Sequence, residues 1–184
     1  MKNNNICPWW MGYMLIIPFR KFGQDPEEIL SPHIKPGMAI MDYGCAMGYF
    51  SIPLARMTGR QGQVFCVDIQ KKMLTKLKRR SVKYNVTSII RPLQVGKNYH
   101  PVDLSGQLDF ILLFSVVHEV PDKIKLFRDL YIMSKSGCKV LFAEPKSHVS
   151  QETFAKSLQL AQSAGFKVTD EKPMQKELCK FLIK

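Results

Sequence analysis

Short apolar runs alternate with helical patterns along most of this chain of 184 residues. The apolar runs are bounded by Gly, Asp or Pro, as strands buried on both faces usually are, and they cover residues 38 to 42, 63 to 68, 108 to 114 and 139 to 143. A further run at 88 to 95 contains Pro92, which favours an edge strand. The helical patterns cover residues 48 to 59, 71 to 83, 121 to 137 and 151 to 165. This alternation predicts an α/β fold with a doubly wound, mostly parallel sheet and helices on both faces.

The helical pattern at 121 to 137 has clear start and stop signals. Pro121 suits a first turn, and Gly137 is expected to end the helix. Ile124, Phe127 and Leu130 or Tyr131 recur on one face, which we expect to be buried.

Both ends of the chain depart from the alternation. Near the C-terminus, FKVTDE and ELCKFLIK read as two strands joined by a turn at Lys172 and Pro173, which predicts an antiparallel hairpin. Three prolines interrupt the first 37 residues. We therefore expect a single domain over residues 38–184, preceded by an N-terminal helical segment over residues 1–37.

Cysteine usage indicates a reducing compartment. The five cysteines form no CxxC pair and no Cys/His cluster, so we expect reduced thiols in the cytoplasm and no metal site. The apolar stretch ICPWWMGYMLIIPF near the N-terminus is too short to span a bilayer and has poor signal-peptide flanks.

The loop after the first expected strand carries the most specific motif. It reads DYGCAMG, with Asp42 followed by small residues at positions 44, 46 and 48. A dinucleotide site would require GxGxxG, and that spacing fails because position 49 is Tyr. In an open α/β sheet the ligand lies beyond the carboxyl ends of the strands, where this loop falls.

The pattern D-x-G-x-[GA]-x-G resembles that of class I S-adenosylmethionine-dependent methyltransferases, and the resemblance extends over about residues 36 to 184. LDFILLFSVVHEVPD resembles the family's fourth-strand motif, and SGCKVLFAEP resembles its fifth strand. Among subgroups the chain looks most similar to small generic methyltransferases, with the quinone-type and arsenite-type enzymes as relatives. The resemblance implies seven strands with an antiparallel last strand, S-adenosylmethionine as cofactor, and methyl transfer as activity.

The resemblance also implies a set of cofactor contacts. Asp42 would hold the ammonium group, and Asp68, at the end of the second expected strand, would accept the ribose hydroxyls. The full set is Asp42, Tyr43, Gly44, Cys45, Ala46, Gly48, Asp68, Ile69, Gly96, Asn98, Phe114 and Ser115. Ala46 replaces the usual central glycine, at a cost of about 1 kcal/mol if its φ is positive. Cys45 is interpreted as a packing residue.

Two side chains are candidates for chemistry at the acceptor. His118 follows the fourth expected strand, and it either takes a proton from the acceptor or orders the loop. Glu144 leaves the fifth strand and holds a substrate, holds a neighbouring His, or anchors the loop.

Trp9, Trp10 and Tyr13 form an aromatic cluster that we interpret as a lid over cofactor and acceptor. The alternatives are an interfacial helix that contacts a membrane surface, and packing against the sheet edge or a second subunit.

The formal net charge of +12 raises the question of a polyanionic partner. Lys72, Lys76, Arg79 and Lys83 fall on one helix face, and a solvated face is favoured over nucleic acid there. We expect a small-molecule methyl acceptor and a monomer or homodimer. The alternatives are an RNA or protein methyltransferase that uses the basic face, and a non-catalytic cofactor-binding or interaction module.

Overall fold

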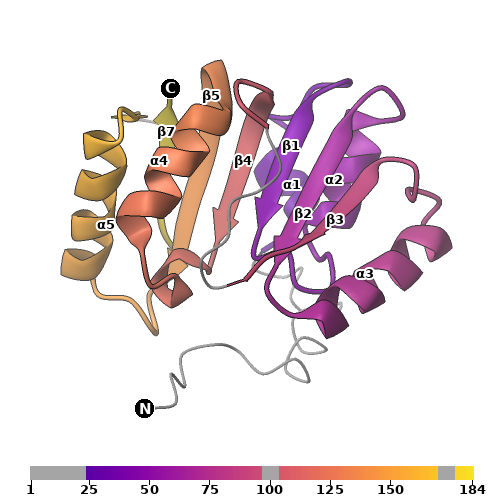
Figure 1. The fold of residues 1–184 in the computed structure, drawn as a ribbon, viewed down its shortest axis with the longest axis horizontal. Helices are drawn as coiled ribbons and strands as arrows, with labels where there is room; N and C mark the ends of the chain where they lie inside the picture. The colour runs from indigo at the N-terminus through magenta and orange to yellow at the C-terminus, as the bar shows by residue number, and fades with distance from the viewer. Residues whose placement is uncertain (1–23, 97–103, 170–176) are drawn as a thin grey trace. The chain divides into compact units, whose positions relative to one another are not determined.

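The computed structural model describes residues 24–96, 104–169 and 177–184 (Figure 1). The chain divides into two compact units, Met1–Tyr99 and His100–Lys184, called unit one and unit two below. The expected single domain over residues 38–184 stays a prediction.

Unit one consists of a parallel three-stranded arrangement with its helices. Its elements are α1 (Pro26–Leu30), β1 (Ala39–Tyr43), α2 (Ser51–Thr58), β2 (Gln63–Asp68), α3 (Lys71–Lys83) and β3 (Ile90–Gln94). β2 pairs in parallel with β1 on one side and with β3 on the other. β3 carries Pro92 and is an edge strand, as the sequence predicts, because proline has no N–H to donate to a second neighbour.

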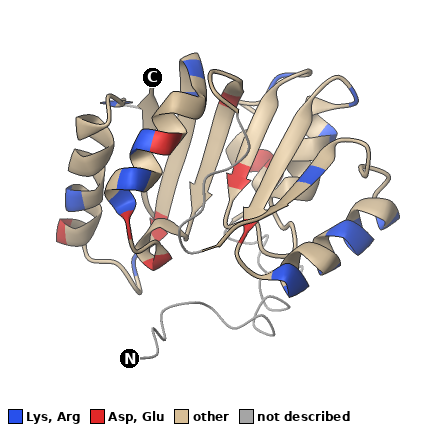
Figure 2. Cartoon of the chain, viewed as in Figure 1, with Lys and Arg blue, Asp and Glu red and all other residues tan. Residues whose placement is uncertain are grey.

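The helices of unit one bury the faces that the sequence predicts. Met73, Leu74 and Leu77 of α3 are buried. The opposite side of α3 is basic, and Lys and Arg recur along it (Figure 2). Pro53 lies in the first turn of α2, where its missing N–H costs no helical hydrogen bond.

Unit two contains the remaining strands and two long helices. Its elements are β4 (Leu108–Phe114), a 3₁₀ helix (Val117–Glu119), α4 (Lys123–Met133), β5 (Ser134–Pro145), α5 (Gln151–Ser163), β6 (Lys167–Val168) and β7 (Glu177–Ile183). β4 and β5 are parallel, whereas β7 is antiparallel to both β5 and β6. The predicted C-terminal hairpin is therefore confirmed, although its turn at Lys172 and Pro173 lies outside the described residues. α4 and α5 lie side by side (Figure 1).

α4 ends earlier than the sequence predicts, at Met133 rather than at Gly137. The chain enters β5 directly, where Ser134 pairs with Leu108 and its Oγ donates a 2.7 Å hydrogen bond to the Leu130 carbonyl. The expected burial of Ile124 is also wrong, because its side chain is 53% exposed while Phe127 is fully buried.

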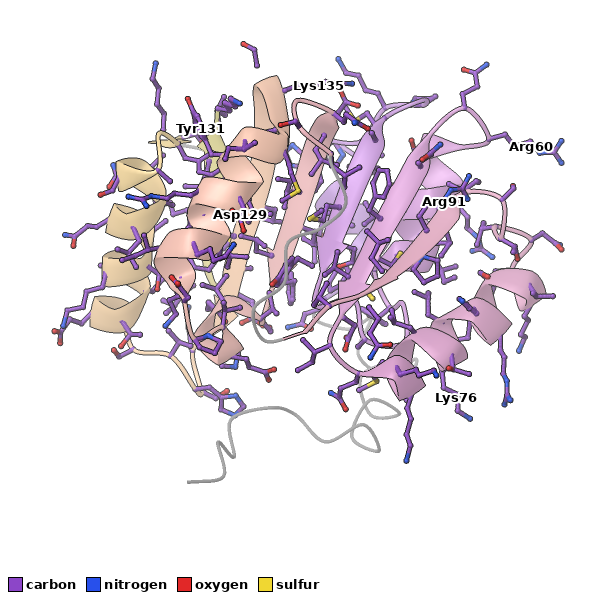
Figure 3. The ribbon with its side chains drawn as sticks, in the orientation of Figure 1. Arg60, Lys76, Arg91, Asp129, Tyr131 and Lys135 are labelled. Carbon is purple, nitrogen blue, oxygen red and sulfur yellow. The ribbon has the colours of Figure 1, made fainter. Side chains whose placement is uncertain are left out.

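A close contact determines how α5 leads into β6. Gly165 has a φ of 113°, and a Cβ there would lie 2.7 Å from the ring of Tyr131. Tyr131 is labelled on α4 in Figure 3. Only glycine fits both the backbone conformation and the space. Among the described helices, none is both long and apolar enough to cross a membrane.

Candidate functional site

The loop after β1 turns three times through the left-handed region. Gly44, Ala46 and Gly48 have φ values of 78°, 47° and 81°. The N–H groups of Gly44 and Cys45 donate to the carbonyl of Val67 at 2.8 and 3.0 Å, which ties the loop to the end of β2. The φ of Ala46 is thus positive, and the strain expected in that case is present, because the backbone crowds a side chain at positive φ.

The far end of this loop packs tightly on α3. A Cβ at Gly48 would overlap the side chain of Leu77. Arg80 of α3 donates from Nη1 to the carbonyl of Met47. The glycine therefore serves close approach of the loop to the helix as well as positive φ.

Asp42 is a buried carboxylate at the end of β1. Its side chain is 3% exposed, and its Oδ2 accepts a 2.5 Å hydrogen bond from Ser51 Oγ on α2. Burial raises the pKa of Asp42 to about 7, the Ser51 bond opposes this rise, and the charge of Asp68 adds to it.

Asp68 lies at the end of β2 and accepts a hydrogen bond from the same loop. Its Oδ2 accepts from the backbone N–H of Ala46 at 2.9 Å, and its Oδ1 accepts from that of Gln70 at 2.8 Å. Burial raises the pKa of Asp68, and these backbone bonds act in the opposite direction. Two carboxylates on neighbouring strand ends therefore bracket the loop.

Cys45 is a packing residue, as the sequence predicts. It is 4% exposed, and burial followed by the neighbouring Cys66 raises its pKa well above the ordinary thiol value. A thiol in this environment stays protonated and unreactive. In the described part of the chain, no three His, Cys, Asp or Glu side chains gather in a metal-binding arrangement.

The other predicted cofactor contacts are divided between the two units. In unit one, Tyr43 is half-buried, Ile69 is 37% exposed, and Gly96 is exposed. In unit two, Phe114 is buried, and Ser115 has a φ of 57°. Asn98 and the predicted lid residues Trp9, Trp10 and Tyr13 lie outside the described residues.

His118 and Glu144 meet at the carboxyl ends of β4 and β5. The ring Nδ1 of His118 is 2.6 Å from Glu144 Oε2, and its backbone N–H donates to Oε1 at 2.9 Å. Glu144 is 2% exposed, whereas the His118 side chain is 23% exposed. The hydrogen bond to Glu144 raises the pKa of His118, against a lowering by burial. Two of the roles considered for Glu144 are observed, because it holds the ring of a neighbouring His and anchors the loop through the His118 backbone N–H.

Sequence reasoning missed three contacts of this site. Ser51 on Asp42, Arg80 on Met47 and the Gln70 N–H on Asp68 were not predicted. A serine that opens a helix after a glycine-rich loop gives no sign of its hydrogen-bond partner, since the bond depends on how α2 packs. The Gln70 contact had a signal, because an Asp commonly accepts from the N–H two residues on.

A family model described as a methyltransferase domain matches residues 34–181. The chain belongs to this methyltransferase-domain family. The family predicted from DYGCAMG is thereby confirmed.

Individual relatives of the chain are also methyltransferases. The methyltransferase domain is 25% identical over 114 residues to a demethylmenaquinone methyltransferase from Oceanobacillus iheyensis, which covers 61% of this chain and 46% of the relative. It is 23% identical over 109 residues to an arsenite methyltransferase from Halobacterium salinarum, which covers 59% of this chain and 27% of the relative. The chain thus spans less than half the length of either relative.

A solved structure confirms the fold class. The crystal structure of a SAM-dependent methyltransferase from Aquifex aeolicus superimposes with a TM-score of 0.83 at 22% identity, covering 96% of this chain and 97% of that one. The α/β fold with a mostly parallel seven-stranded sheet and antiparallel last strands is therefore the one that the sequence predicts.

Proposed function

We propose that this methyltransferase domain binds S-adenosylmethionine and transfers its methyl group to a small-molecule acceptor. The observation that carries the proposal is the bracketing of the positive-φ loop by two buried carboxylates, Asp42 and Asp68. Membership of the family supports it independently.

The chemistry of these carboxylates fits the cofactor. Within the described residues, neither Asp42 nor Asp68 forms an ion pair with Lys, Arg or His, and the pKa of each is raised by burial. A ligand that brings an ammonium group and hydroxyl donors would favour the ionised form of both. We assign the ammonium to Asp42 and the ribose hydroxyls to Asp68, whose oxygens each retain a second lone pair beside their backbone bond.

The loop itself would contribute shape rather than charge. With φ positive at three alternate positions, its backbone curves closely, and Gly44 leaves room on the ligand side. When bound, S-adenosylmethionine supplies a methyl group already activated on a sulfonium, so alignment and exclusion of water provide much of the acceleration.

Thermal-shift titration tests the cofactor. S-adenosylmethionine and S-adenosylhomocysteine should stabilise the protein increasingly with concentration, whereas NAD should not. Asp68→Asn should weaken binding about 10–100-fold through loss of charge-assisted hydrogen bonds. Glu28→Gln removes an exposed carboxylate of unit one and should leave the affinity unchanged. No shift with either sulfur compound would favour a non-catalytic module.

A small acceptor and a cytoplasmic location complete the proposal. The two relatives described above are named for demethylmenaquinone and arsenite, which are small molecules. Four buried free thiols, at Cys45, Cys66, Cys138 and Cys179, suit a reducing compartment such as the cytoplasm.

One observation favours RNA as a second candidate acceptor. Arg56, Arg80 and Lys83 lie 5.0, 5.8 and 5.9 Å from the ring centroid of Tyr84, and no carboxylate of the described residues pairs with these cations. Cations around an aromatic ring suit phosphate and base contacts. Steeply salt-dependent RNA binding that Tyr84→Ala weakens would move the acceptor to nucleic acid.

A further inference from the structure

Ser51 is the first residue of α2, and its side chain is fully buried. A buried hydroxyl needs a hydrogen-bond partner, because leaving it unpaired costs free energy. Two other buried serines in helices, Ser81 and Ser157, each donate to a carbonyl of their own helix, at 2.8 and 3.1 Å. Ser51 instead donates to Asp42 Oδ2, so its hydrogen bond leaves the helix and reaches the end of β1.

This hydrogen bond closes the base of the glycine loop. It joins residues nine positions apart, at the end of β1 and the start of α2, on either side of Gly44 and Gly48. Its length of 2.5 Å is typical of a hydroxyl that donates to an ionised carboxylate. Because the donor is buried and belongs to a helix, it restricts rotation of the carboxylate and so fixes the direction of Asp42 Oδ1.

The other oxygen of Asp42, Oδ1, is left for a ligand. No donor from the described residues reaches it, and it is not fully buried, although the side chain is only 3% exposed. The charged and titratable groups around Asp42 in unit one are Asp68 on β2 and the thiols of Cys45 and Cys66. None of these brings a positive charge, so an ammonium group of a ligand would supply the missing one.

A purely structural contact would not need a carboxylate here. Burial raises the pKa of Asp42 to about 7, and the hydrogen bond from Ser51 acts against this rise by favouring the charged form. An amide at position 42 would accept the same hydroxyl without the cost of burying a charge. A carboxylate together with a donor that keeps it ionised is what an ammonium ligand requires.

We propose that Ser51 is a positioning residue of the cofactor site, whose hydroxyl holds Asp42 Oδ2 so that Oδ1 receives the ammonium group of the cofactor. This inference rests on the proposed function and adds the residue that orients its ammonium contact. It involves the end of β1, the glycine loop and the start of α2, all within unit one.

Calorimetric titration of the full chain with two ligands tests the proposal. The ligands are S-adenosylhomocysteine and its desamino analogue, in which hydrogen replaces the α-amino group, so the ratio of their dissociation constants isolates the ammonium contact. Wild type should bind S-adenosylhomocysteine about 10–100-fold more tightly than the analogue. Ser51→Ala should reduce this preference about 10-fold and change the affinity for the analogue less than about 2-fold.

A matched control and a second variant accompany this measurement. Ser81→Ala also removes a buried hydroxyl from a helix of unit one, and it should leave both dissociation constants unchanged. Ser51→Cys keeps a weak donor, so its preference should lie between those of wild type and Ser51→Ala. It decides the question if Ser51→Ala does not fold. An unchanged preference, or equal weakening of both ligands, would overturn the role of Ser51.

The preference should also depend on pH, which a merely structural serine would not affect. Only ionised Asp42 attracts an ammonium group, so in wild type the preference should rise between about pH 5.5 and 8, with its midpoint near the pKa of about 7. Asp68 would meet the ribose of both ligands and cancels in the ratio. Ser51→Ala loses a hydrogen bond to the charged form, so its rise should move to higher pH. A rise at the same pH in both proteins would overturn the proposal.

The failure of this inference and that of the proposed function give different results. Equal affinity of wild type for the two ligands would mean that Asp42 holds no ammonium group, and the inference would be wrong although the protein binds the cofactor. Absence of binding of both ligands to wild type would overturn the proposed function, and this inference with it.

Discussion

At the scale of single residues, Ala46 is the clearest case of local strain at the site. Its φ of 47° is unfavourable for a side chain, and its N–H must still reach Asp68. Ala46→Gly should therefore stabilise the protein by about 0.5–1 kcal/mol, measured by urea unfolding. Ala155→Gly in the exposed face of α5 should destabilise it by a similar amount. Destabilisation by both changes would show that Ala46 is unstrained.

Asp42 should make stability depend on pH. Its pKa of about 7 in the folded chain exceeds the ordinary value of 3.8, so the folded chain retains a proton that the unfolded chain releases between these pH values. Ionisation thus destabilises the fold as the pH rises through this window. Asp42→Asn, which keeps an acceptor for Ser51, should be more stable than wild type at about pH 8, by on the order of 2–4 kcal/mol.

This advantage of Asp42→Asn should shrink as the pH falls toward about 4, because both proteins are then neutral at this position. Urea unfolding of the two proteins across the range measures the difference. Asp68 is present in both proteins, so it contributes to the difference only through its repulsion with ionised Asp42. A difference that is constant with pH would mean that Asp42 titrates normally in the folded state.

Residue types at this site were predictable, whereas most of their partners were not. The motif DYGCAMG and the acid ending the second strand gave Asp42 and Asp68 directly. The 2.5 Å bond from Ser51 to Asp42 joins residues on two packed elements, and only the packing angle of α2 determines it. The pairing of Glu144 with a histidine, in contrast, was one of the roles expected from the sequence; His118 and Glu144 are 26 positions apart and meet because β4 and β5 are parallel neighbours.

At the scale of elements, the contact between the glycine loop and α3 should be sensitive to a single methyl group. Gly48→Ala should destabilise the protein by about 2 kcal/mol or more, since it adds overlap with Leu77 to the strain of positive φ. Gly59→Ala is the matched control, because its φ is 68° and a Cβ there would meet nothing within 4 Å. The control should lose only about 1 kcal/mol. If the two variants lose the same free energy of unfolding in urea, then α3 moves to accommodate the added methyl group.

Element boundaries show where periodicity alone fails. The pattern over 121 to 137 correctly predicts a helix that buries Phe127 and Leu130, but it places Ile124 inside and the end at Gly137. Residues 134 to 136 include no helix-breaking residue, yet they belong to β5, because Ser134 pairs with a residue of β4. Pairing with a distant strand outweighs local helix propensity here.

At the scale of the whole molecule, charge is distributed unevenly. The net charge is +12, and α3 alone carries seven Lys and Arg and no Asp or Glu. Unit two contains ion pairs between Lys and acidic side chains, such as Lys125–Asp129 and Lys156–Glu152. Two lysines also begin α3, where the helix dipole disfavours positive charge. Repulsion among the cations of α3 should therefore destabilise unit one at low salt.

Salt should consequently stabilise the protein. Raising NaCl from about 20 mM to about 300 mM screens like charges and should raise Tm by a few degrees. Lys71→Glu, at the first position of α3, should raise stability by about 0.3–1 kcal/mol at low salt and reduce the gain from added salt. Lys156→Glu on α5 reverses the charge of a lysine that is already paired with Glu152, and it should destabilise slightly instead. A Tm that falls with added salt would mean that attractive ion pairs dominate, because screening would then remove more attraction than repulsion.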